Sequence, residues 1–191
     1  MDINKAIKKQ NKSLRRFVLL MSFIFLFLPL MTLKFKTFNL YIIIYLVIIE
    51  TVILSSVFIK TNNEYLIFGD KKYKIIIKSG LFNHKIHLIC DRVVLVHAIR
   101  IQKDFHLVII LKSRFRNKKI KPMDANFFSK YNELKDEFNK IKRQHPAEEY
   151  FYFAVKKGGV KKNNLLLLIY KSCVYAYFTD ETIRKIKEWT K

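Results

Sequence analysis

Long apolar stretches and short polar ones alternate along the chain, and the two longest apolar stretches stand near its N-terminal end. Residues 17–33 form an uncharged run of 17 residues, and residues 40–59 form a run of 20 residues interrupted only by Glu50. At about 1.5 Å per residue, such helices reach roughly 25 and 30 Å, close to the thickness of a membrane's hydrocarbon core. Because only residues 34–39 separate the runs, the pattern predicts a two-helix transmembrane hairpin.

Glu50 is the only acidic or basic residue inside the two predicted membrane-spanning runs. A central acid costs about 2.5–3.5 kcal/mol on insertion, and the surrounding Leu, Ile, Val and Phe residues outweigh that cost. Ionisable residues within a membrane are functional candidates. Two interpretations stay open: a protonated Glu50 that hydrogen-bonds to helix backbone, Thr51 or a second copy of the hairpin, or a step in a proton or ion pathway.

Basic residues flank the hairpin and predict its orientation. Residues 1–16 form a basic tail, and a strongly basic region follows residue 60, whereas the loop carries only Lys34 and Lys36. The positive-inside rule therefore predicts a multi-pass cell-membrane protein with both termini in the cytoplasm. A cleaved signal peptide is the alternative for the first run. It is disfavoured because no small-x-small site follows Leu33 and a second apolar run comes almost at once.

After the hairpin, the pattern changes to short segments of period two. We predict strands at residues 65–68, 73–78, 85–89, 93–101, 105–112 and 119–122. A helical stripe then follows Asp124, with apolar residues three and four positions apart, and His145-Pro146 ends it. Residues 61–143 are thus predicted to form a mainly antiparallel β domain with a capping helix, which makes the chain an α+β membrane protein.

Residues 144–191 are interpreted as a C-terminal strand-strand-helix extension. Apolar segments at 150–155, 165–170 and 174–178 predict strands, and the last helix starts at Thr179 or Asp180. The pattern leaves open whether this extension enlarges the preceding sheet or forms a separate lobe.

A resemblance comes from the segment KYKIIIKSGLFNHKIHLICDRVVLVHAI at residues 72–99. Its Ser79-Gly80-Leu81 turn, polar return over residues 83–87 and D-R-V-V-L-V strand at residues 91–96 follow a membrane hairpin. This order resembles the bacterial pleckstrin-homology-like (PH-like) domains called membrane-flanked domains. The resemblance implies a PH-like cytoplasmic domain over residues 61–143. It further implies, for some members, self-immunity or tolerance against membrane-active peptide bacteriocins.

Catalytic and cofactor-binding motifs are missing from the sequence. Glycine occurs only at positions 69, 80, 158 and 159, which excludes phosphate loops of the G-x-G-x-x-G and P-loop types. Because the acids are sparse and scattered, we predict no enzyme, no cofactor and no metal site. His84 and His87 point to opposite faces of a strand and do not converge with Asp91.

The two cysteines, Cys90 and Cys173, are predicted to be reduced and unpaired, because the soluble part is predicted to lie in the cytoplasm.

The chain combines 51% hydrophobic residues with a net charge of +22, and its basic residues fall into clusters. Each basic side chain near an anionic leaflet contributes about 1 kcal/mol of binding free energy. The predicted membrane-surface contacts are Arg15, Arg16, Lys60, Lys71, Lys72 and Lys74. A second basic patch comprises Lys112, Arg114, Arg116, Lys118, Lys119 and Lys121, and a third cluster comprises Lys156, Lys157, Lys161 and Lys162. With Phe115 and nearby tyrosines, these clusters also permit nucleic-acid binding.

The sequence therefore predicts a non-enzymatic integral membrane protein whose basic domain binds anionic lipid at the membrane surface or a protein partner. A bacteriocin self-immunity or membrane-stress tolerance factor is one specific form of this hypothesis. The first alternative is an accessory subunit of a secretion, conjugation or transport complex, or a homo-oligomer, that packs through the hairpin. The second alternative is a membrane-tethered nucleic-acid binder.

Overall fold

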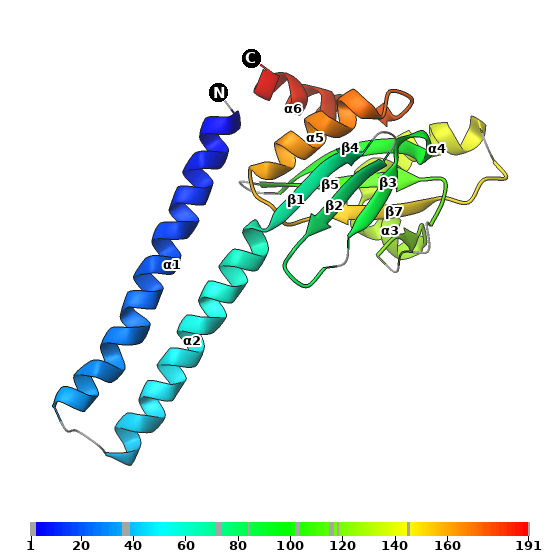
Figure 1. Ribbon diagram of the computed structural model, residues 1–191. Helices are drawn as coiled ribbons and strands as arrows, with labels where there is room; N and C mark the ends of the chain where they lie inside the picture. The colour runs from blue at the N-terminus through cyan, green and yellow to red at the C-terminus, as the bar shows by residue number, and fades with distance from the viewer. Residues whose placement is uncertain are drawn as a thin grey trace.

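A computed structural model of the chain describes residues 3–35, 39–71, 74–83, 85–101, 104–114, 117, 119–144 and 146–190. Two long helices, α1 (Ile3–Lys34) and α2 (Leu40–Glu64), form an antiparallel hairpin that projects from an α+β domain (Figure 1). Both helices are long and apolar enough to cross a membrane, and they contain the predicted runs at residues 17–33 and 40–59. On length and composition alone, the two helices favour association of the chain with a membrane.

The basic segment at residues 1–16 was predicted as a tail, but from Ile3 onward it is the first part of α1. Ile3 and Ala6, three positions apart, are buried, and the Gln10 side chain is bonded to residues 158 and 160 of the domain. A helix that has formed in the apolar run adds one hydrogen bond per further residue, so continuation is favourable. This segment is a helical extension that packs on the domain.

Two sheets make up the domain. The first is an antiparallel meander of β1 (Leu66–Lys71), β2 (Lys74–Ser79) and β3 (Ile86–Ile89). The second has the order β6-β7-β5-β4-β8, from β4 (Val93–Ile101), β5 (Asp104–Leu111), β6 (Lys121–Pro122), β7 (Phe151–Val155) and β8 (Tyr177–Phe178). A short helical turn, η1 (Cys90–Arg92), joins the two sheets. All pairings are antiparallel except β4 with β8. Each strand predicted between residues 65 and 122 has its counterpart here.

The helix predicted after Asp124 begins as expected and is then interrupted. The Asp124 carboxylate accepts a hydrogen bond from the Phe127 N–H at 3.0 Å, as an N-cap does. Tyr131 leaves the helical region with φ −128° and ψ 56°. The segment is therefore divided into α3 (Ala125–Lys130), the turn η2 (Asn132–Leu134) and α4 (Lys135–Gln144).

Residues 165–170 were predicted to be a strand, and this prediction is wrong. They lie in α5 (Lys161–Ser172), where Leu165, Leu166 and Ile169 are buried at helical spacing. A short apolar run such as LLLLIY has no periodicity that separates a buried helix from a strand. The segment predicted at 174–178 is reduced to the two residues of β8, and the last helix is α6 (Asp180–Thr190).

The C-terminal extension is consequently strand-helix-strand-helix, not strand-strand-helix. Its β7 pairs with β5 and its β8 with β4, so these residues enlarge the sheet and do not form a separate lobe.

The central strand β5 is covered on both faces. Leu107, Ile109 and Leu111 pack with the three-stranded sheet and α5, while Val108 and Ile110 pack against α3 and η2. Alternate residues of a strand point to opposite faces, so one sequence of consecutive apolar residues supplies both cores.

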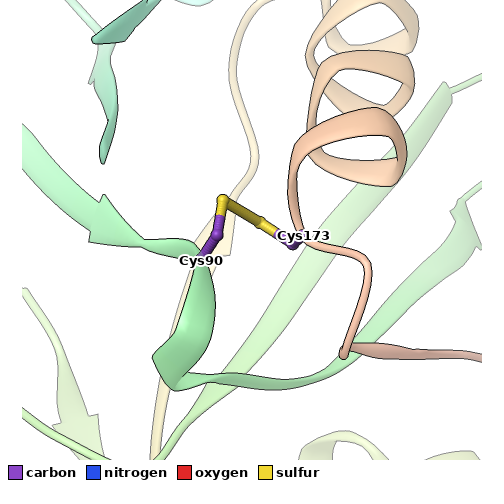
Figure 2. Close-up of a disulfide and its surroundings, with 2 residues drawn as sticks. All are labelled: Cys90 and Cys173. Carbon is purple, nitrogen blue, oxygen red and sulfur yellow. A yellow bond between two sulfur atoms is a disulfide. The ribbon is translucent and has the colours of Figure 1, made fainter. Parts of the chain in front are cut away.

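Cys90 and Cys173 were predicted to be unpaired, and the structure contradicts this. A disulfide joins them, with 4.6 Å between the two Cα atoms (Figure 2). Cys90 lies in η1 and Cys173 directly follows α5, 83 residues later in the sequence. The prediction relied on the compartment and carried no information on the fold, which brings the two segments together.

Candidate functional site

A cavity of about 330 Å³ is lined by residues from the β6–β7 edge of the larger sheet, from the end of α3, and from β2, β3 and the loop between them. Two tyrosines, Tyr131 and Tyr152, form part of its wall, and Ser79 and Asn83 lie on the side of the loop. Five lysines line it as well, and we call this site the lysine pocket: Lys119, Lys121, Lys130, Lys156 and Lys157.

Three segments of the chain bring these lysines together. Lys119 and Lys121 flank Ile120. This residue is completely buried and holds the start of β6 against the core. Lys130 is the last residue of α3, and Lys156 and Lys157 directly follow β7. Because β6 pairs with β7, the lysines of these two segments lie along one sheet edge.

The charged side chains that line the pocket are all positive. Burial lowers the pKa of Lys119, and the charge of Lys157 lowers it further. Burial also lowers the pKa of Lys156, followed by its contact with Lys130 and the charge of Lys121. Among the described residues, no salt bridge involves any of the five lysines. The pocket therefore holds concentrated positive charge that an anion from outside can neutralise.

The tyrosines add hydrogen-bonding and aromatic surface. The rings of Tyr131 and Tyr152 are 6.2 Å apart in an edge-to-face arrangement, and the Lys130 ammonium lies 5.8 Å from the Tyr131 ring centroid. Burial is the main cause that raises the pKa of both phenols, so each remains a hydroxyl that can donate to an anionic oxygen. Ammonium and hydroxyl donors in one cavity suit a phosphate group.

The loop after β2 connects this pocket to the end of the hairpin. The Leu81 N–H donates to the Asn62 side chain of α2 at 3.0 Å, and the Phe82 ring lies 5.5 Å from the Phe58 ring. Phe82 is nevertheless 81% exposed. Figure 1 shows the loop lying beside the end of α2. Since the apolar run of α2 ends at Ile59, Phe82 lies where the hairpin changes from apolar to polar.

Gly80 permits this loop. Its φ of +89° is in the left-handed region, and a Cβ there would lie 2.9 Å from the Asn83 amide nitrogen. Its own N–H donates to the Tyr65 carbonyl at 2.9 Å, which holds the loop against the start of β1.

The predicted membrane-surface residues separate into two groups. Arg15, Arg16 and Lys60 are exposed at the domain end of the hairpin's apolar part, and Lys60 is paired with Glu64 at 3.1 Å. Lys71 and Lys74 are opposite each other at the far end of β1 and β2, away from α2 (Figure 1). Lys72 lies outside the described residues.

The predicted basic patch is divided in a similar way. Lys119 and Lys121 line the lysine pocket, whereas Lys112 is paired with Glu148 at 3.0 Å, and Arg114 is exposed. Arg116 and Lys118 lie outside the described residues.

The third cluster contributes Lys156 and Lys157 to the pocket, but Lys162 is fully buried and bonded to Asp104 at 2.6 Å.

Sequence reasoning missed Lys130. A signal existed, because the helix predicted from Asp124 directly follows β6 and places its next turns beside that strand.

Glu50 is half-buried on α2, and the neighbouring Thr51 hydroxyl donates to the Val47 carbonyl at 2.8 Å. Its role in the membrane stays a prediction. His87 and Asp91 are both exposed, and His84 lies outside the described residues.

Comparisons with protein-family models, with curated proteins and with solved structures gave no match to this chain. The geometry and charge of the described residues are therefore the basis for its function.

Proposed function

We propose that this chain is a non-enzymatic membrane protein whose lysine pocket binds the phosphate group of an anionic lipid. In this proposal α1 and α2 cross the membrane, both termini lie in the cytoplasm, and the domain rests on the leaflet at the end of the hairpin. The observation that carries the proposal is the set of five lysines for which the described residues provide no acidic salt-bridge partner, in a pocket whose wall includes the loop tied to α2.

The magnitudes support binding at a surface. Each lysine near an anionic leaflet contributes about 1 kcal/mol, and about 1.4 kcal/mol changes affinity tenfold. Five such contacts correspond to about three to four orders of magnitude before the loss of side-chain freedom is subtracted. Phe82 adds an exposed apolar ring near the end of the apolar run of α2, where it can enter the boundary between headgroups and acyl chains.

The same proposal takes the domain to be PH-like. An antiparallel meander over β1, β2 and β3, followed by β4 and β5 and then by a capping helix, supports this assignment. It remains secondary to the lipid proposal, which depends on the lysine pocket and not on the name of the fold.

The experiment measures lipid binding by the full chain, purified in detergent. Short-chain phosphatidylglycerol and phosphatidylcholine of equal chain length are titrated, with binding followed by native mass spectrometry. We expect phosphatidylglycerol to be preferred and the Lys130→Gln/Lys156→Gln variant to weaken its binding at least about tenfold. Equal binding of the two lipids would contradict the proposal.

The matched control is Lys142→Gln/Lys171→Gln, which removes the same charge from two exposed lysines outside the pocket. It should bind phosphatidylglycerol as the unchanged chain does. An equal loss in both variants would mean that net charge, and not the pocket, attracts the lipid. A single-stranded oligonucleotide that displaces phosphatidylglycerol from the pocket at 0.15 M salt would favour nucleic-acid binding instead.

A further inference from the structure

A second cluster of titratable side chains lies at the opposite edge of the larger sheet. His97 of β4, Glu133 of η2 and Glu181 of α6 face one another, and their ligand atoms all lie within 4.8 Å of one another. The His97 Nε2 atom is 3.8 Å from a Glu133 carboxylate oxygen and 3.9 Å from a Glu181 carboxylate oxygen. We call these three residues the His97 cluster.

The His97 ring is only 4% exposed, yet its Nε2 atom has no hydrogen-bond partner among the described residues. Distances of 3.8 and 3.9 Å exceed those of an N–H···O hydrogen bond. A buried polar atom without a partner is rare in folded proteins and asks for an explanation.

Two buried threonines determine which nitrogen of the ring carries the proton. The Ala98 N–H donates to the Thr182 hydroxyl at 2.9 Å, and that hydroxyl donates to the Val96 carbonyl at 3.3 Å. The Thr182 hydrogen is then used, so the contact of 2.9 Å between the two threonine hydroxyls needs the hydrogen of Thr179. The contact of 2.8 Å between Thr179 and His97 Nδ1 consequently needs the hydrogen of Nδ1.

This assignment supplies a hydrogen to all four contacts, and in the neutral ring, the form in which histidine binds a metal, it leaves Nε2 as a bare lone pair. The lone pair is then directed at two carboxylates, an arrangement of three electron-rich groups that repel one another unless a cation lies between them.

We propose that His97, Glu133 and Glu181 bind a divalent transition-metal ion, with Zn²⁺ as the representative. Neutral imidazole and carboxylate are ordinary zinc ligands, whereas Mg²⁺ and Ca²⁺ prefer oxygen ligands alone. A histidine whose second ring nitrogen donates a hydrogen bond is typical of metal ligands, because that bond fixes the tautomer and the direction of the ring. Thr179 has that role here.

The geometry needs only a small adjustment. Zinc bonds to nitrogen and oxygen are about 2.0–2.2 Å long, so ligand atoms around a tetrahedral ion lie about 3.3 Å apart. The side chains of Glu133 and Glu181 are 70% and 48% exposed, and they can move inward by less than 1 Å while the buried His97 stays in place. Three protein ligands leave a coordination position for water.

The experiment titrates ZnCl₂ into the full chain, purified in detergent without a histidine tag and treated with a chelator. Calorimetry should show one Zn²⁺ per chain. Cobalt(II) should give a visible absorption band of a tetrahedral or five-coordinate site. We expect Glu133→Gln and Glu181→Gln each to weaken Zn²⁺ binding at least about tenfold. Both residues are exposed, so both variants should fold.

Glu188→Gln is the matched control, because it removes one exposed carboxylate from the same helix α6 without touching the cluster. It should bind Zn²⁺ with unchanged affinity. The proposal is overturned if the unchanged chain takes up no Zn²⁺, or if Glu133→Gln and Glu181→Gln bind it as tightly as Glu188→Gln does.

Discussion

The lysine pocket and the His97 cluster lie at opposite edges of one sheet and have opposite charge imbalances. The pocket, at the β6–β7 edge, is lined by five lysines and, among the described residues, by no acid, whereas the cluster, beside β4 and α6, places two carboxylates around a ring nitrogen. One short segment serves both, since Lys130 and Tyr131 line the pocket and Glu133 belongs to the cluster. The interruption of the helix at Tyr131 lets neighbouring residues turn to different sites.

The two sites also differ in rigidity, and this difference indicates what each can bind. His97 is held by a buried threonine chain, which suits an ion that demands fixed bond lengths and directions. The pocket's lysines are exposed or half-buried and have long side chains, which suit a phosphate that can be approached from several directions. Fixed geometry favours a metal, and mobile charge favours a lipid surface.

Within the described part of the chain, the pocket lysines form no salt bridge, whereas Lys162 is paired with Asp104. Its ammonium donates to Asp104, to the Phe105 carbonyl and to the Lys156 carbonyl, in a fully buried position. Lys162→Met should lower the free energy of unfolding by about 2–4 kcal/mol, because buried carbonyls lose their donor. Denaturant unfolding of the full chain in detergent measures it. Lys156→Gln should change the same quantity by less than about 0.5 kcal/mol, and a large loss there would show that the pocket lysines are structural.

The disulfide joins η1 to the end of α5. Removing it with Cys90→Ala/Cys173→Ala should lower the free energy of unfolding by about 2–4 kcal/mol, since it closes a loop of 83 residues. Alkylation of the denatured chain without reductant should leave both cysteines unmodified. Modified cysteines would mean that the bond is absent.

The disulfide and the flanking charges indicate different compartments, because disulfides are typical of oxidising compartments, whereas the charges predict a cytoplasmic domain. We expect a membrane-impermeant reductant and maleimide to leave the cysteines of intact cells unlabelled, as the cytoplasmic orientation requires. Labelling would move the lysine pocket to the outer surface.

Thr182 gives a smaller effect that separates the two sites. Thr182→Val keeps the shape of the side chain but leaves the Ala98 N–H without its acceptor. It also removes the hydroxyl that orients the Thr179 hydroxyl beside His97. We expect a loss of about 1–3 kcal/mol in unfolding free energy and weaker Zn²⁺ binding, measured by denaturation and calorimetry. Phosphatidylglycerol binding should be unchanged. If it weakened as well, the two sites would not be independent.

The smallest expected effect is a pH dependence of the lysine pocket. The pKa values of Lys119 and Lys156 lie below the ordinary lysine value of about 10.4, so these lysines lose their charge at lower pH than exposed lysines do. Phosphatidylglycerol, a phosphodiester, keeps its charge over this range, and its affinity should therefore fall as pH rises toward that value. Lys119→Gln/Lys156→Gln should show a flatter profile in the same titration, and an equally steep profile would contradict the assignment.

Local patterns were enough for the hairpin and for the strands between residues 66 and 111, because each is decided by the periodicity of a few neighbouring residues. They failed at α5, where consecutive leucines fit both a helix and a strand, and at the Cys90–Cys173 pair, which depends on the fold. The lysine pocket was half predictable, since its lysines stand in sequence clusters. The His97 cluster gave no signal, because its three residues come from separate elements without any motif spacing.

The contact between Gln10 and residues 158–160 has a mechanical consequence. The Val160 N–H donates to the Gln10 side chain at 2.8 Å, and the Gly158 N–H donates to the Asn63 carbonyl of α2 at 2.8 Å. A domain joined to the hairpin only through Tyr65 could rotate about that connection. Here hydrogen bonds from both helices restrict the rotation. Inserting one residue into α1 after Leu14 would rotate Gln10 by about 100° relative to the rest of the helix and break its hydrogen bonds to the domain. The orientation of the domain relative to the two helices is thus set jointly by α1 and by the end of α2.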